Sequence, residues 1–196
     1  RRDSSGAFLP GMVTVGSFMP LADTQLARLL EVPNCLGVEL PVRTIADILG
    51  SESSDDSLLL DLEQAWLSQL DEVLSRGMTP VLYTSRGELS FPNSKAKLLF
   101  GTSLAQLMAR LVNLLAPRLG YLISKGGITT NVILSDGLNL DCVMLEGQIL
   151  PGLSLVRPVK SCLSDALPII TFPGNLGDSE TLFEAWNLME VGRMSK

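Results

Sequence analysis

The chain has 196 residues, of which 46% are apolar and 18% charged, and its formal net charge at pH 7 is −6. This length and composition exclude an intrinsically disordered chain and predict one sizeable globular core. The acidic balance and the scatter of the basic residues argue against a nucleic-acid partner. A mean hydropathy of +0.31, high for a soluble domain, indicates that some apolar surface faces a partner.

The residues that the chain lacks exclude several kinds of site. It contains no histidine, which removes every Ser-His, Cys-His and His-metal mechanism. Its cysteines, Cys35, Cys142 and Cys162, match neither a disulfide framework nor a zinc site, so we predict no metal site and a reducing, cytoplasmic location. No apolar run reaches the ~18 residues of a membrane span and no signal peptide precedes the domain, so no membrane partner is expected. The chain starts at Arg1 without a methionine, which favours a piece cut from a longer polypeptide.

The first half of the chain alternates short β-rich runs with helical patterns. Residues 1–11 end in Pro10-Gly11 and are interpreted as a tail or linker before a domain that covers residues 12–196. Strands are predicted over residues 12–15, 35–40 and 80–84. Helices are predicted from a cap at Asp23 to Leu30, from Pro41 to Leu49, and, after a polar loop at residues 50–57, along an apolar stripe from Leu58 to Leu74 that Gly77 ends.

The second half continues the alternation. Strands are predicted over residues 121–123, 140–146 and 169–172, with a turn at Gly147 after the second of them. Helices are predicted from a cap at Thr102 or Ser103 to Leu115, from the glycine loop to Leu134, and along residues 182–189. Because strands and helices alternate with short connections, the sequence predicts an α/β fold with three α/β/α layers and a largely parallel central sheet.

Three loops share one design, in which a short apolar strand runs into small residues and then into a helix. They are Gly16-Ser17, Lys125-Gly126-Gly127-Ile128-Thr129 and Gly174-Asn175-Leu176-Gly177. In a parallel sheet such loops gather at the carboxyl ends of the strands, where ligands bind. Glycine lets the backbone approach a ligand closely, and a helix N-terminus adds partial positive charge. Together these features suit a phosphate group.

Other interpretations of these residues stay open. Glycine after a strand is also common turn chemistry. Neither a Walker sequence nor a dinucleotide Gly-x-Gly-x-x-Gly after a strand is present, so the site is not a standard P-loop or dinucleotide site. Arg86 and Lys125 are the cations nearest the loops, and each is either a phosphate contact or a solvated surface charge. Asp178 is either a magnesium ligand or, as we prefer, a helix N-cap.

The ordered set of motifs resembles the C-terminal nucleotide-binding domain of the four-carbon acid sugar kinases. The segments that carry the resemblance extend from about residue 13 to residue 186, and each is weak alone although the ordered set is specific. They are Val15-Gly16-Ser17 with Thr24-Gln25, Tyr83-Thr84-Ser85-Arg86-Gly87, Ser124-Lys125-Gly126-Gly127-Ile128-Thr129, Glu146-Gly147-Gln148-Ile149-Leu150-Pro151-Gly152 and Phe172-Pro173-Gly174-Asn175-Leu176-Gly177-Asp178.

This resemblance implies a fold, a cofactor and partners. Such kinases phosphorylate sugar acids of the threonate and erythronate class with ATP and Mg²⁺, and a separate N-terminal domain binds the sugar acid. Further phosphate contacts are expected from Asn175 and Gly177, and a homo-oligomer is a further expectation. The residues that the resemblance places against ATP are Ser17, Gly126, Gly127, Ile128, Thr129 and Gly174.

The sequence also departs from the family pattern. Many members have an acidic residue where Ile128 stands. The Gly-Gly-Ile-Thr form resembles a branch found in long multidomain chains with dehydrogenase-like and aldolase-like units. That branch often has an aspartate where Val132 stands. The sugar-binding domain, which would join from the same longer chain or as a separate subunit, is not in these 196 residues.

Three functions are therefore compared. The first is the ATP-binding domain of a sugar-acid kinase, with catalytic residues that the sequence does not identify and no activity expected from this domain alone. The alternative is a non-catalytic interaction domain that retains the kinase-domain fold, which the high hydropathy and the residue at Val132 favour. The third, an unrelated nucleotide- or coenzyme-binding enzyme, is disfavoured because the dinucleotide fingerprint is absent.

Overall fold

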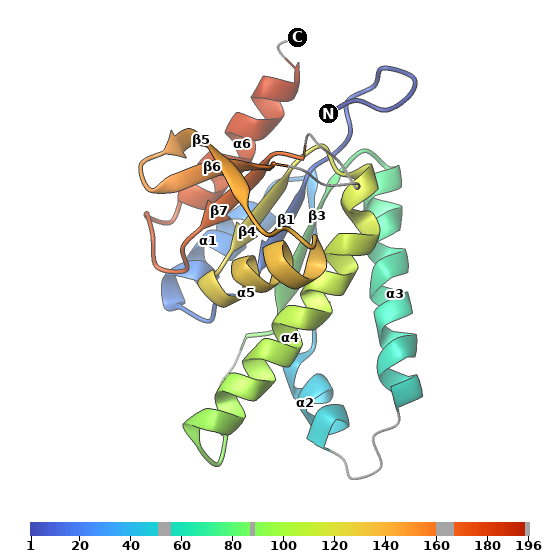
Figure 1. The fold of residues 1–196 in the computed structure, drawn as a ribbon, viewed down its shortest axis with the longest axis vertical. Helices are drawn as coiled ribbons and strands as arrows, with labels where there is room; N and C mark the ends of the chain where they lie inside the picture. Colours follow the sequence, from blue (N-terminus) through green and yellow to red (C-terminus); the bar gives the residue numbers. More distant parts are fainter. Residues whose placement is uncertain (51–55, 87–88, 160–166, 195–196) are drawn as a thin grey trace.

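A seven-stranded sheet forms the centre of the molecule (Figure 1). The computed structural model describes residues 1–50, 56–86, 89–159 and 167–194. The strands lie in the order β2-β3-β1-β4-β7-β6-β5. Their bounds are β1 Met12–Val15, β2 Cys35–Leu40, β3 Thr79–Thr84, β4 Leu122–Lys125, β5 Val143–Leu150, β6 Leu153–Pro158 and β7 Ile169–Phe172.

Five of the strands, β2, β3, β1, β4 and β7, pair in parallel. The central strand β1 places Val13 beside Val81 of β3 and Ile123 of β4. All four residues of β1 and of β4 are buried. Parallel strands are covered on both faces, which explains why they are short runs of apolar residues without alternation. The prediction of a largely parallel sheet is confirmed.

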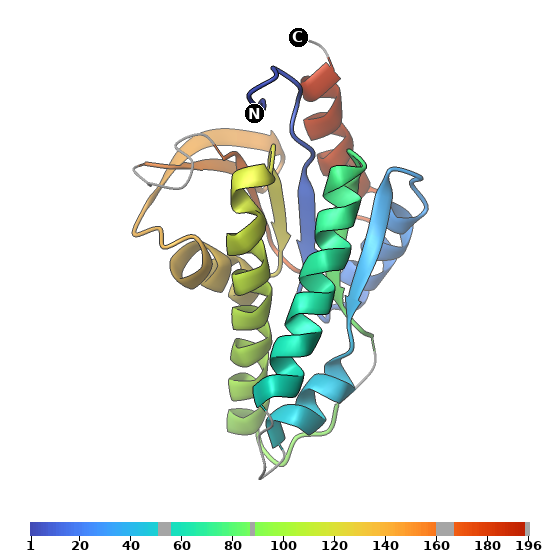
Figure 2. The same cartoon turned by 90° about the vertical axis from the view of Figure 1, so that its right-hand side faces the viewer.

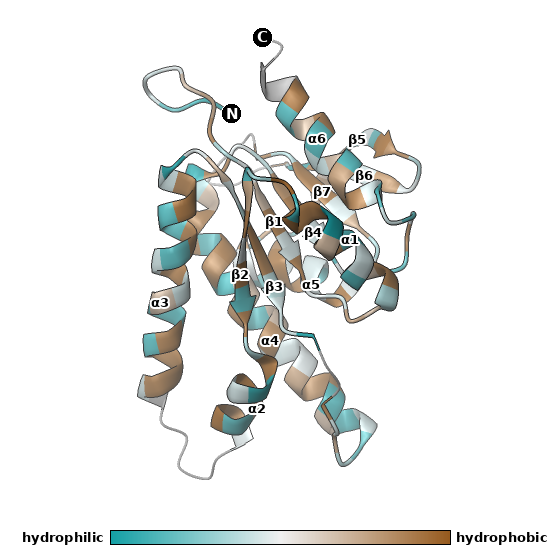
Figure 3. Ribbon diagram, turned by 180° about the vertical axis from the view of Figure 1, so that it is seen from behind, coloured by the Kyte–Doolittle hydropathy of each residue, from teal (hydrophilic) through white to brown (hydrophobic). Residues whose placement is uncertain are grey.

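Helices cover both faces of the sheet, which confirms the predicted three layers (Figures 1 and 2). One face is covered by α2 (Val42–Gly50), α3 (Asp56–Ser75), α4 (Ser94–Leu115) and α5 (Gly127–Val132), which continues as a π-helical turn over Ile133–Gly137. The other face is covered by α1 (Pro20–Leu30) and α6 (Thr181–Met194), which Figure 3 shows from behind. Two apolar cores result, one on each side of the sheet.

Two predicted helix starts are wrong. Helix α4 begins at Ser94, because the Asn93 side chain accepts a hydrogen bond from the amide of Ala96 at 2.8 Å and caps the helix there. Thr102 and Ser103 lie inside the helix, where their hydroxyls donate to carbonyls four residues earlier. Helix α1 likewise begins at Pro20, so Asp23 lies in its first turn and does not cap it.

The hairpin of β5 and β6 corrects the predicted strand over residues 140–146. Gly147 is not a turn: it lies within β5 at φ +149°, at a shift in the register between β5 and β6. The chain turns after β5 at Pro151-Gly152, where Gly152 has φ +79°. Strand β6, which the sequence analysis missed, then returns antiparallel between β5 and β7. The predicted polar loop lies mostly outside the described residues, since residues 51–55 belong to a gap.

Helix α4 and the 3-10 turn Ala116–Arg118 form the longest apolar segment. By length and composition, Ser94–Arg118 is the one helix among the described residues that is long and apolar enough to cross a membrane. The core helix of a soluble protein passes the same test, and the second half of α4 is buried in the core from Leu104 to Leu115. The first half extends past the sheet (Figure 2), and Leu98 and Leu99 are exposed there.

The first residues lie against the end of α4. The Arg1 guanidinium donates to the carbonyls of Ala116 and Leu119 at 3.0 and 2.8 Å, and Arg2 forms an isolated bridge with Phe8. The division into a tail over 1–11 and a domain over 12–196 stays a prediction.

Candidate functional site

The three predicted loops follow β1, β4 and β7, which are neighbours in the sheet. Backbone pairing continues one residue beyond the strands. The amide of Gly16 donates to the Lys125 carbonyl at 3.0 Å, and the amide of Gly126 donates to the Phe172 carbonyl at 2.9 Å. The carboxyl ends of the three strands are therefore held side by side, and the loops that leave them form one cluster.

Glycines allow the loops of this cluster to touch. A Cβ on Gly174 would lie 2.5 Å from Ser17 Oγ, and a Cβ on Gly16 would lie 2.0 Å from Thr129 Oγ1. Gly126 has φ +123°, and its Cβ would lie 3.2 Å from the Ser17 amide nitrogen. Only glycine fits such approaches and such a backbone. The structure thus brings together four predicted residues from three loops, namely Ser17, Gly126, Thr129 and Gly174.

The other two residues of the glycine loop face outward. Gly127 is exposed, and a Cβ there would meet nothing within 4 Å. Ile128 is 55% exposed and lines the pocket described below. Thr129 and Thr130 are buried instead, and the Thr130 hydroxyl pairs with Ser124 Oγ at 2.9 Å. Gly127 and Ile128 therefore lie on the open, outer side of the cluster.

Lys125 is buried beneath the cluster and is not a surface charge. Its exposed fraction is 0%, and its Nζ donates to the Pro173 carbonyl at 3.2 Å and lies 3.8 Å from the centre of the Phe172 ring. Burial lowers the pKa of Lys125 to about 8 because the charged amine loses water. The amine thus joins the loops after β4 and β7 and places a positive charge under the cluster.

Asn175 and Gly177 lie on the outer part of the β7 loop. Asn175 is exposed. Gly177 has φ +82°, and its Cβ would lie 2.3 Å from Thr181 Oγ1, so this glycine serves the turn into α6. Asp178 accepts hydrogen bonds from the Glu180 amide and from Thr181 Oγ1, and the bond from Thr181 lowers the pKa of its carboxyl. A phosphate contact from Asn175 or Gly177 stays a prediction.

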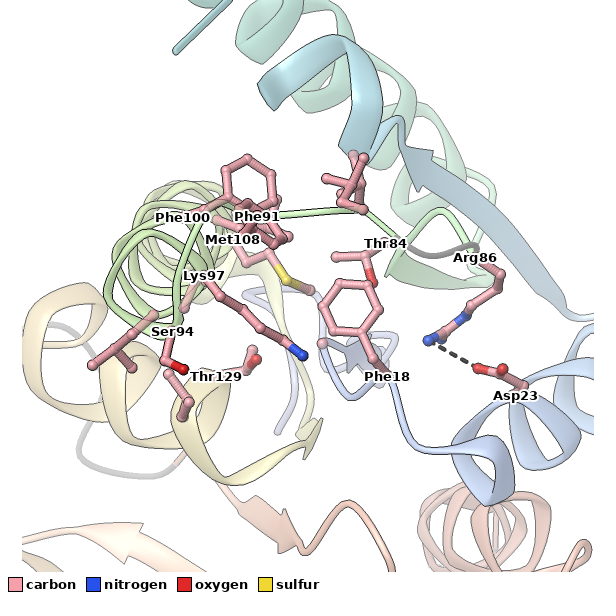
Figure 4. A pocket seen from close by; sticks show the side chains of 18 of the residues that line it. Phe18, Asp23, Thr84, Arg86, Phe91, Ser94, Lys97, Phe100, Met108 and Thr129 are labelled. Atoms are coloured by element: carbon pink, nitrogen blue, oxygen red, sulfur yellow. Dashed lines mark ion pairs between the residues drawn. The ribbon is translucent and has the colours of Figure 1, made fainter. Parts of the chain in front are cut away.

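A pocket of about 880 Å³ opens beside the cluster, on the α4 side of the sheet (Figure 4). Gly16, Ile128 and Thr129 border it on the cluster side, and the first half of α4 forms the opposite wall. Its apolar lining includes Phe18, Leu89, Phe91, Leu98, Phe100 and Met108.

Arg86 follows the end of β3 and lines this pocket. One nitrogen of its guanidinium, Nη1, is held by two neighbours. Its Nη1 donates to the Ser17 carbonyl at 2.6 Å and forms an ion pair with Asp23 Oδ1 at 3.0 Å. Burial is the main cause that lowers the pKa of Arg86, and Asp23 partly offsets it. The predicted phosphate contact Arg86 is therefore tied to a residue of the loop cluster, across 69 positions of sequence.

Lys97 was missed by the sequence analysis. Its amine points into the pocket from α4, near Thr129 (Figure 4). With a cap placed at Thr102 or Ser103, residue 97 lay outside the predicted helix and had no position relative to the loops. Asn93, followed by residues that favour a helix, is the signal that would have placed it.

The residues that the structure describes include no group of three or more acidic, cysteine or histidine side chains that could hold a metal ion. Of the carboxylates nearest the cluster, Asp23 is paired with Arg86 and Asp178 is hydrogen-bonded within its own turn. A divalent cation here would therefore depend mainly on oxygen atoms of its ligand.

Comparison with known proteins matches the chain to a family. The model of a family described as the nucleotide-binding C-terminal domain matches residues 12–182. No curated protein matches the chain.

Solved structures show the same fold. The chain is similar to a domain of unknown function (DUF1537) from Bordetella bronchiseptica, a domain-swapped dimer with bound citrate, with a TM-score of 0.70 and 19% identity over 94% of this chain and 42% of that one. It is also similar to a putative tRNA synthase from Salmonella typhimurium LT2, with a TM-score of 0.57 and 20% identity over 93% of this chain and 42% of that one. The chain thus spans less than half the length of either protein. Because the family match extends from β1 into α6, the chain belongs to the nucleotide-binding C-terminal domains of the four-carbon acid sugar kinase family.

Proposed function

We propose that the domain binds ATP with Mg²⁺ at the loop cluster, as the ATP-binding half of a cytoplasmic kinase that phosphorylates sugar acids of the threonate and erythronate class. The observation that carries this proposal is the meeting of three glycine loops around Ser17, where Cβ atoms on Gly126 and Gly174 would crowd the Ser17 backbone and hydroxyl. Such a cluster leaves backbone amides free to approach phosphate oxygens.

The residues around the loop cluster fit the chemistry of phosphoryl transfer. Catalysis consists mainly of positioning and of neutralising charge on the phosphates. Gly127 and Ile128 are exposed at the cluster, Lys125 adds a positive charge beside it, and Arg86, which is paired with Asp23, contacts it through the Ser17 carbonyl. Mg²⁺, held by phosphate oxygens, would supply the remaining charge. Nothing among the described residues identifies a base for the acceptor hydroxyl, which we assign to a sugar-binding domain.

The size of related proteins supports a separate acceptor domain. The chain covers 42% of the Bordetella protein, so that protein has room for a second domain of similar size. The same protein was solved with citrate, a hydroxy acid with several carboxylates. A carboxylate-bearing acceptor is consistent with that ligand.

Nucleotide binding by this chain tests the proposal directly. We expect ATP and ADP with Mg²⁺ to raise the melting temperature, because a ligand that binds only the folded state adds about 2.7 kcal/mol of stability at one hundred times its Kd. Calorimetric titration gives the Kd, and Mg²⁺ without nucleotide is the control. A melting curve that millimolar nucleotide leaves unmoved would contradict the proposal.

A non-catalytic interaction domain is the second candidate. It is favoured by exposed apolar residues at the pocket, where Phe18 and Leu98 line the wall and are followed in the chain by the exposed Met19 and Leu99. Residue 132 also favours it. The related branch often has an aspartate at this position, whereas Val132 is apolar and buried in the core. A chain that binds a partner but no nucleotide would support this candidate over the kinase. Association of two copies, as in the domain-swapped Bordetella dimer, is a further proposal that light scattering tests.

A further inference from the structure

Buried donors without partners gather at one wall of the pocket. Six buried side-chain atoms of the described residues have no hydrogen-bond partner, and Arg86 Nε, Arg86 Nη2 and Thr84 Oγ1 are three of them. Asp23 Oδ1 is a fourth, and it forms the ion pair with Arg86 Nη1. Thr84 is 0% exposed, and both Thr84 and Arg86 line the pocket. Buried polar groups in folded proteins are almost always hydrogen-bonded, so several unpartnered donors at one place point to an acceptor that the protein alone does not provide.

The unpartnered edge of Arg86 has the geometry of an oxoanion receptor. Its Nη1 is already held by the Ser17 carbonyl and by Asp23, which fixes the plane of the guanidinium. The edge formed by Nε and Nη2 is buried and has no partner among the described residues, and in general this edge of an arginine can bind two oxygens of a carboxylate or phosphate side-on. Arg110 of the same chain uses that edge in this way: its Nε and Nη2 each lie 2.9 Å from an oxygen of Glu63.

The rest of the pocket favours a negative charge. The Lys97 amine points inward from α4, and no hydrogen bond or ion pair joins this amine to any described residue (Figure 4). Among the described residues that line the pocket, Asp23 is the only acid, and it is paired with Arg86. The Phe18 ring lies between Arg86 and Lys97 in this view and is 50% exposed.

We propose that this pocket is an oxoanion site in which Arg86 Nε and Nη2 bind a carboxylate or phosphate group side-on, Thr84 donates from its hydroxyl, and Lys97 neutralises charge from the opposite wall. This site adds detail to the proposed function. It rests on that function only for the identity of the molecule that carries the anion. The anion is either the terminal phosphate of a nucleotide held by the loop cluster or the carboxylate of an acidic acceptor.

The test compares wild type with Arg86→Lys and Lys97→Gln. Arg86→Lys keeps the charge and a donor for the Ser17 carbonyl but removes the two-donor edge. Lys97 is exposed, so Lys97→Gln removes its charge without disturbing the core. Arg110→Lys is the matched control, because its side-on edge is occupied by Glu63. Calorimetric titration measures the Kd for ATP, ADP and AMP with Mg²⁺, for inorganic pyrophosphate, and for threonate with and without ADP.

If a nucleotide phosphate is bound, both variants weaken ATP or ADP at least ten-fold and leave AMP unchanged. If a carboxylate is bound, both variants bind nucleotides normally and weaken threonate at least ten-fold. Wild-type affinity of both variants for every probe would overturn the proposal, as would a wild-type chain that binds none of the probes. A wild-type chain that binds pyrophosphate or threonate through Arg86 but no nucleotide would overturn the proposed function alone.

Discussion

Single residues decide the chemistry of the loop cluster. One of them is Lys125, which is buried beneath the cluster and carries a positive charge there. Its amine is buried, meets only the Pro173 carbonyl and the Phe172 ring, and has no acidic partner among the described residues. A cation in such a place costs stability and is retained where its charge or its hydrogen bond is useful. We therefore interpret Lys125 as the charge that joins the β4 and β7 loops.

We predict that the difference in unfolding free energy between wild type and Lys125→Met depends on pH. Burial lowers the pKa of Lys125 to about 8, whereas in the unfolded chain this side chain keeps a pKa of ~10.4. Between these values the unfolded state binds more protons, so the unfolding free energy of wild type rises with pH. The variant, which lacks the buried charge, should be more stable than wild type at pH 7, and its advantage should shrink by up to about 3 kcal/mol toward pH 10. Urea unfolding of both proteins checks this, and an advantage that stays constant from pH 7 to pH 10 would refute it.

Gly127→Asp should abolish nucleotide binding without unfolding the domain. A Cβ at Gly127 meets nothing within 4 Å, so the side chain fits, while its charge would repel phosphates beside the cluster. We expect no measurable ATP binding and an unfolding free energy within about 1 kcal/mol of wild type. Gly50→Asp is the matched control, since Gly50 is equally open and lies at the end of α2. A Gly127→Asp protein that binds ATP normally would show that this loop does not hold the phosphates.

At the scale of elements, the first half of α4 forms a wall of the pocket and depends on its cap. Leu98 and Leu99 are exposed there, so little burial supports this part of the helix. The Asn93 side chain holds the first turn, which carries Ser94 and Lys97. The position of Lys97 against the pocket therefore depends on a local hydrogen bond more than on the core.

Asn93→Ala should lower the unfolding free energy by about 1 kcal/mol, because the side chain would no longer accept the hydrogen bond from the Ala96 amide. Asn93→Asp retains an acceptor and is expected to restore most of that loss. Hydrogen exchange should be faster in the first turns of α4 of the alanine variant only. Equal stability of the alanine and aspartate variants would mean that the cap does not support the helix.

At the scale of the whole molecule, the chain is a nucleotide-binding C-terminal domain that is shorter than the solved proteins it resembles. It spans 42% of the Bordetella protein, and its pocket opens at the end where α4 extends past the sheet. Phe18 and Leu98 line this pocket and are exposed, and apolar surface of this kind is typical of interaction sites.

Residues 1–196 alone should show no kinase activity toward four-carbon sugar acids. Phosphoryl transfer needs the acceptor hydroxyl in line with the terminal phosphate, and nothing described here positions that hydroxyl or accepts its proton. The assay measures ADP release with ATP, Mg²⁺ and threonate or erythronate, and activity should be recovered when a sugar-binding domain is supplied. Sugar-dependent release by the single domain at about 1 s⁻¹ or more would place the acceptor site within this chain.

Local sequence patterns determined the fold class, most elements and the three loops. The apolar runs of β1, β3, β4 and β7 and the stripes of α3 and α6 follow from side-chain periodicity, which is a property of neighbouring residues. The glycines at 16, 126 and 174 were identified because the strand before each loop is recognisable. The same patterns failed at the β5–β6 hairpin, where Gly147 lies in a strand bulge and the turn follows at Gly152.

Only the tertiary structure decided what surrounds the loops. The sequence could not show that Lys125 is buried, that Arg86 is held by the Ser17 carbonyl, or that Lys97 points into the same pocket. These relations join residues far apart in the chain, 69 positions in the case of Arg86 and Ser17, and depend on the order of strands in the sheet. The strands β3, β1 and β4 lie side by side. For this reason charged and hydroxyl side chains meet at one end of the sheet, although no local sequence pattern connects them.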